Sequence, residues 1–88
     1  MSASTITLLY FARLREALGS GREQLVLPAG VNTLDALRAH LAQRGDAWAK
    51  EMAAGRNLRA AVNQNVAAED TPLSDGDEVA FFPPVTGG

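Results

Sequence analysis

The chain has 88 residues, of which 47% are hydrophobic and 20% are charged, and its formal net charge is −2 at pH 7. This size predicts one globular domain with a modest core, and the charge argues against a surface for nucleic acid or anionic lipid. The absence of cysteine excludes disulfides, thiolate nucleophiles and thiolate metal sites. The first residues lack a basic segment and a long apolar run, so we expect a cytoplasmic protein without a signal or membrane segment.

The first part of the chain predicts two strands with a helical turn between them. Residues 5–12 (TITLLYFA) are rich in β-branched and aromatic residues, as strands are. Both alternate sets of this strand become apolar toward its end, which favours a central place in a sheet. Residues 13–23 predict a helical turn that closes at Gly19 and Gly21, and residues 24–30 (QLVLPAG) predict a second, short strand.

The clearest helix is predicted over residues 31–45 (VNTLDALRAHLAQRG). Asn32 or Thr33 can cap its N-terminus, and Gly45 is expected to stop it. Three leucines at helical spacing predict its buried stripe: Leu34, Leu37 and Leu41. Apolar residues on one face and a closing glycine likewise predict a shorter helix over residues 46–55.

The last part of the chain predicts a strand pair and one further strand. Residues 58–67 (LRAAVNQNVA) favour a pair of short strands or one bent strand, with turn chemistry from Asn63 and Asn65. An Asp75-Gly76 turn then leads into a strand from Glu78 to Phe82.

The order of these elements predicts an α+β fold, with one main helix packed on one face of a small mixed sheet. We expect the first strand beside the last, parallel to it and in the middle of the sheet. Pro83 and Pro84 should end the last strand, because neither can donate a hydrogen bond to a neighbouring strand. The predicted organisation is a domain over residues 1–82 and a flexible C-terminal tail over residues 83–88.

Three other patterns are interpreted as structural rather than chemical. His40, the only histidine, has no nucleophile or ligand set with it and is expected to be a solvated helix residue. The acids of residues 75–78 (DGDE) lack the spacing of a calcium loop, so they predict a polar turn, although they could also guide docking to a basic partner. Residues 19–21 (GSG) lack the lysine and the context of a phosphate loop and predict a turn.

Two phenylalanines indicate a partner site. If Val79 and Phe81 face the core, Ala80 and Phe82 point away from the helix. The same alternation turns Leu9 and Phe11 outward on the first strand. Apolar side chains gathered on an uncovered face often mark a partner site. The alternative is a different register that buries both rings in the core.

The C-terminal segment VTGG ends in a carboxylate, which is the one group that could carry chemistry in a sequence without a nucleophile, a ligand set or a cofactor loop. Conversion of the terminal carboxylate into an acyl-adenylate would give it a good leaving group, which a sulfur or amine nucleophile could displace. Gly87 and Gly88 leave the carbonyl unhindered and allow the tail to thread a narrow channel. A frayed end without function is the alternative.

Three segments resemble the small subunit of molybdopterin synthase, the MoaD family: residues 8–19 (LLYFARLREALG), 58–66 (LRAAVNQNV) and 72–88 (PLSDGDEVAFFPPVTGG). The ending GDEVAFFPPVTGG is the most specific of them. The resemblance implies a β-grasp, ubiquitin-like fold. It also implies that the chain alone catalyses nothing and serves as the sulfur-donor subunit of a sulfurtransferase complex.

The resemblance further implies the chemistry and the partners. An activating enzyme would adenylate the Gly88 carboxylate with ATP and magnesium, and a sulfur-donating protein would supply the sulfur for a thiocarboxylate. The tail would then insert into the large subunit, in a heterotetramer of two small and two large subunits. There it would donate sulfur to cyclic pyranopterin monophosphate in molybdenum cofactor biosynthesis. Neither a bound cofactor nor a metal site in the chain itself is implied.

Several residues match positions of the family. Gly87 and Gly88 match its terminal pair, and Gly88 would carry the sulfur. Phe11, Val66 and Phe82 match its apolar docking positions, and Arg15 matches a basic interface position. The remaining tail residues are expected to contact the partners as the tail inserts: Pro83, Pro84, Val85 and Thr86.

Other functions fit parts of this pattern. The sulfur carrier of thiamine synthesis has the same fold and terminal chemistry, but is typically shorter and lacks the FFPPVTGG ending. A ubiquitin-like modifier would form stable isopeptide bonds with lysines of other proteins. A β-grasp binding module would work without Gly88.

Overall fold

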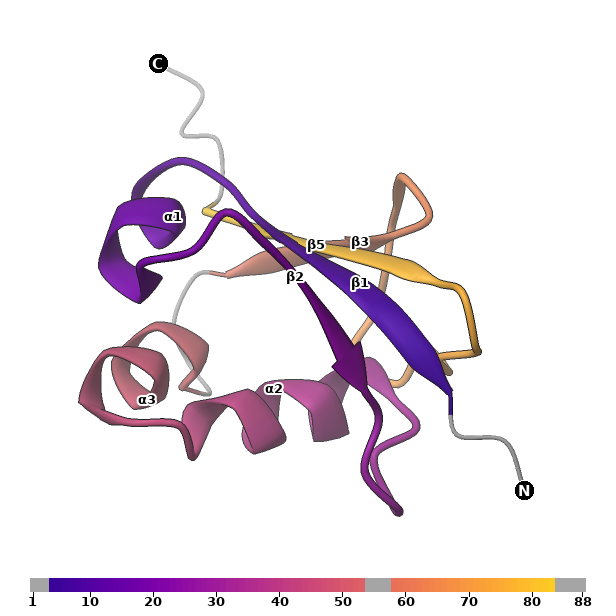
Figure 1. Cartoon of the computed structure of the whole chain (residues 1–88). Helices are drawn as coiled ribbons and strands as arrows, with labels where there is room; N and C mark the ends of the chain where they lie inside the picture. Colours follow the sequence, from indigo (N-terminus) through magenta and orange to yellow (C-terminus); the bar gives the residue numbers. More distant parts are fainter. Residues whose placement is uncertain (1–3, 54–57, 84–88) are drawn as a thin grey trace.

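The computed structural model describes residues 4–53 and 58–83. Their elements, in chain order, are β1 (Thr5–Tyr10), α1 (Arg13–Leu18), β2 (Arg22–Val26), α2 (Leu34–Ala42), α3 (Asp46–Met52), β3 (Arg59–Val62), β4 (Asn65–Val66) and β5 (Glu78–Phe82). The strands form one sheet in the order β2-β1-β5-β3-β4 (Figure 1). β1 pairs parallel with β5 in the middle, and the other neighbours are antiparallel. The predicted α+β fold and its central parallel pair are confirmed.

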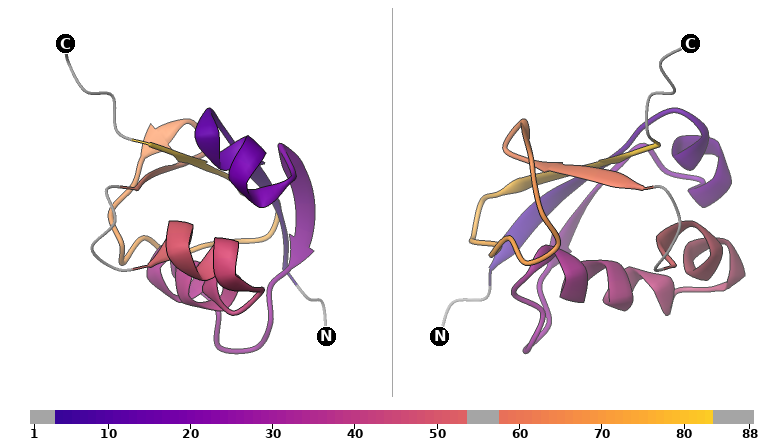
Figure 2. Two further views of the ribbon diagram at one scale, coloured as in Figure 1. Left: turned by 90° about the vertical axis from the view of Figure 1, so that its left-hand side faces the viewer. Right: turned by 180° about the vertical axis from the view of Figure 1, so that it is seen from behind.

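The helices leave one face of this sheet open. α2 and α3 lie together on one face, and α1 lies at the end of the sheet where β1 leads toward β2 (Figure 2). Within residues 4–53 and 58–83, no helix covers the opposite face (Figure 2). None of the helices in these residues is long and apolar enough to cross a membrane.

The core lies between α2 and the sheet. The leucine stripe of α2 is buried as predicted, with Leu37 and Leu41 fully buried and Leu34 only 2% exposed. Alternate residues of β1 and β5 meet it from the sheet, and all are 1% exposed or less: Ile6, Leu8, Tyr10, Val79 and Phe81. Burying one such side chain contributes roughly 1.5–3 kcal/mol, so this single layer holds the helix on the sheet.

Hydrogen bonds at the element ends resolve the open alternatives for capping and turns. Thr33, and not Asn32, caps α2, because its Oγ1 accepts a hydrogen bond from the Ala36 N–H at 3.2 Å. The Asp75-Gly76 turn is confirmed, and the Asp75 carboxylate accepts from the Thr5 N–H at 2.7 Å. The Asp77 carboxylate accepts from the Ser74 N–H at 2.8 Å, so these acids fasten a polar turn as expected.

Several boundaries differ from the prediction; β2, for example, ends at Val26 rather than at residue 30. The first strand ends at Tyr10 rather than at residue 12, because Ala12 has a φ of 56° and the chain turns sharply there into α1. α2 ends at Ala42, and Gly45 begins α3 instead of stopping α2. The turn between β3 and β4 is formed by Asn63 and Gln64, both at positive φ, while Asn65 already belongs to β4. β2 starts at Arg22, two residues before the predicted start.

Candidate docking face and tail exit

The open side of the sheet, here called the outer face, carries a continuous apolar strip. Strand register places four residues of the strip side by side on β1, β5, β3 and β4: Leu9, Ala80, Ala61 and Val66. Val66 stands at the edge and is 72% exposed. The two alanines keep the middle of the strip flat, because their methyl groups rise little above the backbone. A flat apolar strip with a bulky edge is suited to contact with another protein.

Phe82 and Phe11 lie at the end of the outer face where β5 finishes. Val79 and Phe81 are fully buried against the helices, so the alternation turns Ala80 and Phe82 outward, as predicted. The Phe11 N–H donates to the Phe81 carbonyl oxygen at 3.1 Å, which holds the backbone of Phe11 beside the end of β5. Phe11 is 48% exposed and Phe82 is half-buried. The alternative register that buries both rings in the core is therefore wrong.

The backbone bends sharply directly after Phe11. Ala12 has φ 56° and ψ −134°, a conformation that side-chain-bearing residues rarely adopt. Such a residue costs roughly 1–3 kcal/mol, which the surrounding structure must offset. The bend ends β1 at the rim of the outer face and leaves Phe11 exposed there.

Arg15 lies on α1, beside the turn that leads into β2. A Cβ on Gly21 would lie 2.9 Å from Arg15 Nε and 3.3 Å from its Cδ, so the arginine side chain packs directly on the glycine backbone. Arg15 is exposed and, within the described residues, forms no ion pair. The predicted turn at residues 19–21 is confirmed, because Gly19 caps α1 in the left-handed conformation.

A polar network behind the outer face holds β1 in place. Tyr10 donates its hydroxyl hydrogen to Glu23 Oε2 at 2.9 Å, and Arg44 donates to both Glu23 oxygens at 2.7 and 3.0 Å. The Arg44 guanidinium also lies 4.7 Å from the centre of the Trp48 ring, and that ring meets Tyr10 edge to face at 5.4 Å. The network joins β1, β2, the α2–α3 connection and α3, and it includes Tyr10, the residue that precedes Phe11.

The same contacts shift the pKa values of the network. Burial opposes ionisation of Glu23, but hydrogen bonds from Arg44 and Tyr10 outweigh it and hold the Glu23 pKa below its ordinary value. Burial, and then the hydrogen bond to Glu23, raises the pKa of Tyr10 far above its ordinary value. The hydrogen bonds to Glu23 raise the pKa of Arg44. At neutral pH the network therefore consists of an ion pair and a neutral phenol.

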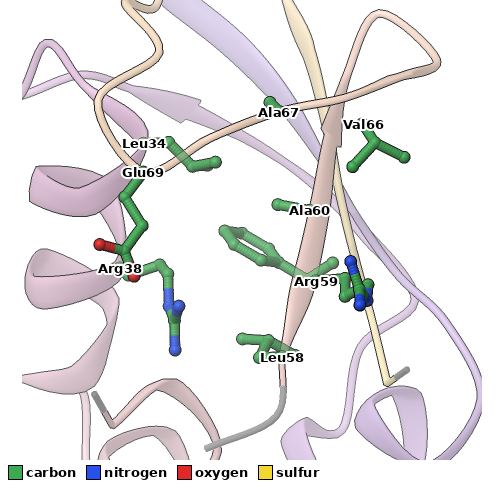
Figure 3. A pocket seen from close by; sticks show the side chains of 9 residues that line it. Leu34, Arg38, Leu58, Arg59, Ala60, Val66, Ala67 and Glu69 are labelled. Carbon is green, nitrogen blue, oxygen red and sulfur yellow. The ribbon is translucent and has the colours of Figure 1, made fainter. Parts of the chain in front are cut away.

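A cavity of about 120 Å³ opens at the edge of the sheet between α2 and β3 (Figure 3). Its apolar wall includes Leu34, Leu58 and Ala60, and Arg38 and Glu69 stand at its α2 side (Figure 3). Arg38 is anchored there, because its Nη2 donates to the carbonyl oxygens of residues 52 and 53 at 3.2 and 3.1 Å.

His40 and the C-terminal tail are the remaining candidates from the sequence. His40 lies half-buried on α2, and the residues that the structure describes contain no group of three or more His, Cys, Asp or Glu that could hold a metal ion. Pro83 is half-buried directly after β5. The rest of the tail lies outside the described residues: Pro84, Val85, Thr86, Gly87 and Gly88. The docking roles of Phe11, Val66, Phe82, Arg15 and Pro83 stay predictions.

Sequence reasoning placed Ala80 on the outer face by strand alternation but missed Ala61. Ala61 carries no signal of its own, because small residues are common in every structural context. It joins the strip through strand register, which sets it opposite Ala80. Arg59 was missed as well, although register sets it directly opposite Phe82.

Comparison with known proteins identifies the family to which the chain belongs. The profile of the ThiS family matches residues 8–88. The molybdopterin synthase sulfur carrier subunit of Escherichia coli is 49% identical over 83 residues, covering 94% of this chain and 99% of that protein. Its counterpart in Haemophilus influenzae is 42% identical over the same shares of the two chains.

Solved structures agree with these relatives. A putative molybdopterin converting factor subunit 1 from Pyrococcus furiosus superposes with a TM-score of 0.77 at 30% identity, over 94% of this chain and 100% of that chain. SAMP1, a small archaeal modifier protein of Haloferax volcanii, superposes with a TM-score of 0.74 at 25% identity, over 97% and 100%. One chain of a complex of molybdopterin-converting factor subunits 1 and 2 from Helicobacter pylori matches with a TM-score of 0.65 at 26% identity, over 96% and 99%.

The mixed sheet with its central parallel pair and crossing helix defines a ubiquitin-like, β-grasp protein. Within this fold the chain belongs to the ThiS family, among the molybdopterin synthase sulfur carrier subunits of molybdenum cofactor biosynthesis.

Proposed function

We propose that the Gly88 carboxylate carries the sulfur and that the outer face docks the chain on the large subunit of molybdopterin synthase. The observation that carries this proposal is the position of β5. This strand lies in the middle of the sheet and ends with Phe82 on the outer face, so the chain continues into residues 83–88 from the rim of the apolar strip. A protein that covers the strip is thereby positioned to receive the terminus.

The chemistry proceeds through an activated acyl group. A carboxylate oxygen of Gly88 attacks the α-phosphate of ATP, and pyrophosphate leaves as the acyl-adenylate forms. A sulfur nucleophile at the sulfide oxidation level then attacks the carbonyl carbon, and AMP departs with the bonding electrons to leave a thiocarboxylate. The thiocarboxylate sulfur attacks a carbon of cyclic pyranopterin monophosphate and displaces an oxygen substituent from it. Water then attacks the acyl carbon and breaks its bond to sulfur, so that the sulfur stays on the pterin and the carboxylate is restored.

The composition of the chain supports this role. Without a cysteine, the chain has no thiol that could hold a transferable sulfur as a persulfide. Glycine at both terminal positions leaves the carbonyl open to attack and lets the tail enter a channel that a Cβ would block. The terminus is therefore the group on which the sulfur is carried.

Three partners follow from this chemistry. An adenylating enzyme activates the terminus with ATP and magnesium, and a second protein donates the sulfur. The large subunit takes the thiocarboxylated tail in a heterotetramer of two small and two large chains. The Helicobacter pylori relative, solved as a complex of subunits 1 and 2, supports the pairing with a large subunit. We place the chain in the cytoplasm, where ATP is available for its activation.

The test is the intact mass of the chain after incubation with the activating enzyme, ATP, magnesium and the sulfur donor. We expect a mass gain equal to the replacement of one oxygen by one sulfur. The chain that lacks Gly88 is the control and should gain nothing. An unchanged mass of the full chain, with an enzyme shown to be active on another carrier, would contradict the proposal.

The likeness to a small archaeal modifier protein makes protein conjugation the second candidate. A modifier would give species heavier by a whole protein, which persist because isopeptide bonds are stable. A carrier for thiamine synthesis would gain the same sulfur but would not release it to the large subunit and the pyranopterin. Both outcomes are visible in the same mass measurement once the acceptors are added.

A further inference from the structure

Arg59 begins β3 and stands at the rim of the outer face from which the tail continues. Register sets it directly opposite Phe82, the last residue of β5. Opposite residues of antiparallel strands have Cβ atoms about 4.5–5.5 Å apart, so the stem of Arg59 lies beside the Phe82 side chain. Figure 3 shows the guanidinium of Arg59 on the side of β3 that carries Val66 and faces away from Arg38.

This guanidinium has no counter-charge in the part of the chain that the structure describes. Arg59 is exposed, and no ion pair or hydrogen bond of its side chain is found among residues 4–53 and 58–83. Glu69 lines the same cavity as Arg59 but forms no ion pair with it. Two other arginines do form ion pairs within the described residues: Arg44 binds Glu23 at 2.7 Å, and Arg13 lies 3.6 Å from Glu51. Arg15 resembles Arg59 in being exposed and without an ion pair there, but it lies on α1 and not beside Phe82.

Charge is distributed unevenly along β5. The strand starts at Glu78, next to the turn that holds Asp75 and Asp77, and it ends beside Arg59. The end of β5 therefore has one positive charge beside it, that of Arg59, although the whole chain carries a net charge of −2. An arginine next to an aromatic ring is typical of the residues that dominate protein interfaces.

We propose that Arg59 is a docking and specificity residue, and that it pairs with a carboxylate side chain of the large subunit beside the entrance for the tail. This inference rests on the proposed docking of the outer face. The large subunit is assigned as the partner because the solved complex of the Helicobacter pylori relative contains subunits 1 and 2. A carboxylate at this place matches the charge and the forked geometry of a guanidinium.

The test compares Arg59→Glu with Lys50→Glu in binding to the isolated large subunit. Both side chains are exposed and both changes alter the net charge equally, but Lys50 lies on α3, in the helix layer away from the outer face. Arg59→Glu should weaken binding about tenfold or more at low salt, because it sets two like charges against each other. The loss should shrink between about 0.05 and 0.5 M salt as screening increases. Lys50→Glu should bind within about twofold of the original chain.

Four further outcomes separate the possible failures. Arg59→Lys keeps the charge but loses the forked geometry, so it should lose less affinity than Arg59→Glu, and equal losses in the Lys and Glu variants would overturn the proposed ion pair. An affinity of Arg59→Glu within twofold of Lys50→Glu, while Phe82→Ala weakens binding, would overturn the role of Arg59 and leave the docking face standing. A loss confined to the activating enzyme would overturn the assignment of the partner. If the original chain failed to bind the large subunit, the proposed docking itself would fall.

Discussion

The Tyr10–Glu23–Arg44 network should contribute measurably to the stability of the sheet that carries the docking face, and Glu23→Ala tests this contribution. Glu23→Ala removes both hydrogen bonds from Arg44, at 2.7 and 3.0 Å, and the one from Tyr10 at 2.9 Å. A hydrogen bond to a charged partner contributes about 1.5–3 kcal/mol when well buried. The Glu23 and Arg44 side chains are 25% and 29% exposed, so water screens part of this interaction.

We therefore expect Glu23→Ala to lower the free energy of unfolding by about 2–3 kcal/mol in total. For a domain of this size, this corresponds to a melting temperature lower by roughly 10–20 °C. The measurement is urea and thermal denaturation at pH 7, with Glu16→Ala, an exposed acid on α1, as the control. A loss below about 0.5 kcal/mol would refute the argument, because it is the range of ordinary surface substitutions.

The pH dependence checks the same contacts independently. The pKa of Glu23 is lower in the folded chain than in the unfolded chain, so the unfolded chain binds the extra proton in the acid range. The stability from Glu23 is present above the unfolded pKa and is lost as the pH falls through the folded pKa. The difference in the free energy of unfolding between the original chain and Glu23→Ala should therefore shrink as the pH falls through this range. A difference that stays constant with pH would contradict the ion pair. For Tyr10 the raised pKa predicts stability that is lost above about pH 10, the ordinary value at which the unfolded phenol ionises.

Three other predictions concern the backbone bend, the strip and the core. Ala12→Gly should raise the free energy of unfolding by about 0.5–2 kcal/mol in urea denaturation. The change removes backbone strain of roughly 1–3 kcal/mol and adds an entropic cost of folding of less than about 1 kcal/mol. A destabilised variant would contradict the strained φ. Val66→Ala, at a side chain 72% exposed, should change stability by less than about 0.5 kcal/mol yet weaken binding to the large subunit in calorimetry, and unchanged affinity would remove Val66 from the interface. Leu37→Ala should cost about 2–5 kcal/mol, since its fully buried side chain would leave a cavity, and a loss below 1 kcal/mol would contradict its place in the core.

Local sequence patterns predicted those elements whose formation depends mainly on residues close together in the chain. The β5 strand is found at the predicted bounds, Glu78 to Phe82, because its alternation is regular and a turn and prolines flank it. Gly45 was assigned to the wrong helix, since a glycine can follow one helix as readily as it can begin the next. The end of β1 was missed because the positive φ of Ala12 is imposed by the fold and contradicts the preference of alanine.

The candidate site was predictable only where its residues are large or chemically distinctive. Phe11 and Phe82 are visible in the sequence because aromatic residues at alternate positions indicate a face. Ala80 follows from the same alternation, whereas Ala61 and Arg59 join them only through strand register, which the sequence does not reveal without the pairing of β3 with β5. The Glu23–Arg44 contact links residues that are 21 positions apart, and no local pattern relates them.

The most direct measurement of the central claim is a single turnover with purified components. The thiocarboxylated chain would be mixed with the large subunit and cyclic pyranopterin monophosphate, and its intact mass would be followed together with the sulfur in the pterin. We predict that the chain returns to its carboxylate mass as sulfur enters the pterin, and only when the large subunit and the pterin are both present. A thiocarboxylate that persists under these conditions, or a chain that accumulates as conjugates on other proteins, would contradict a sulfur carrier of this pathway.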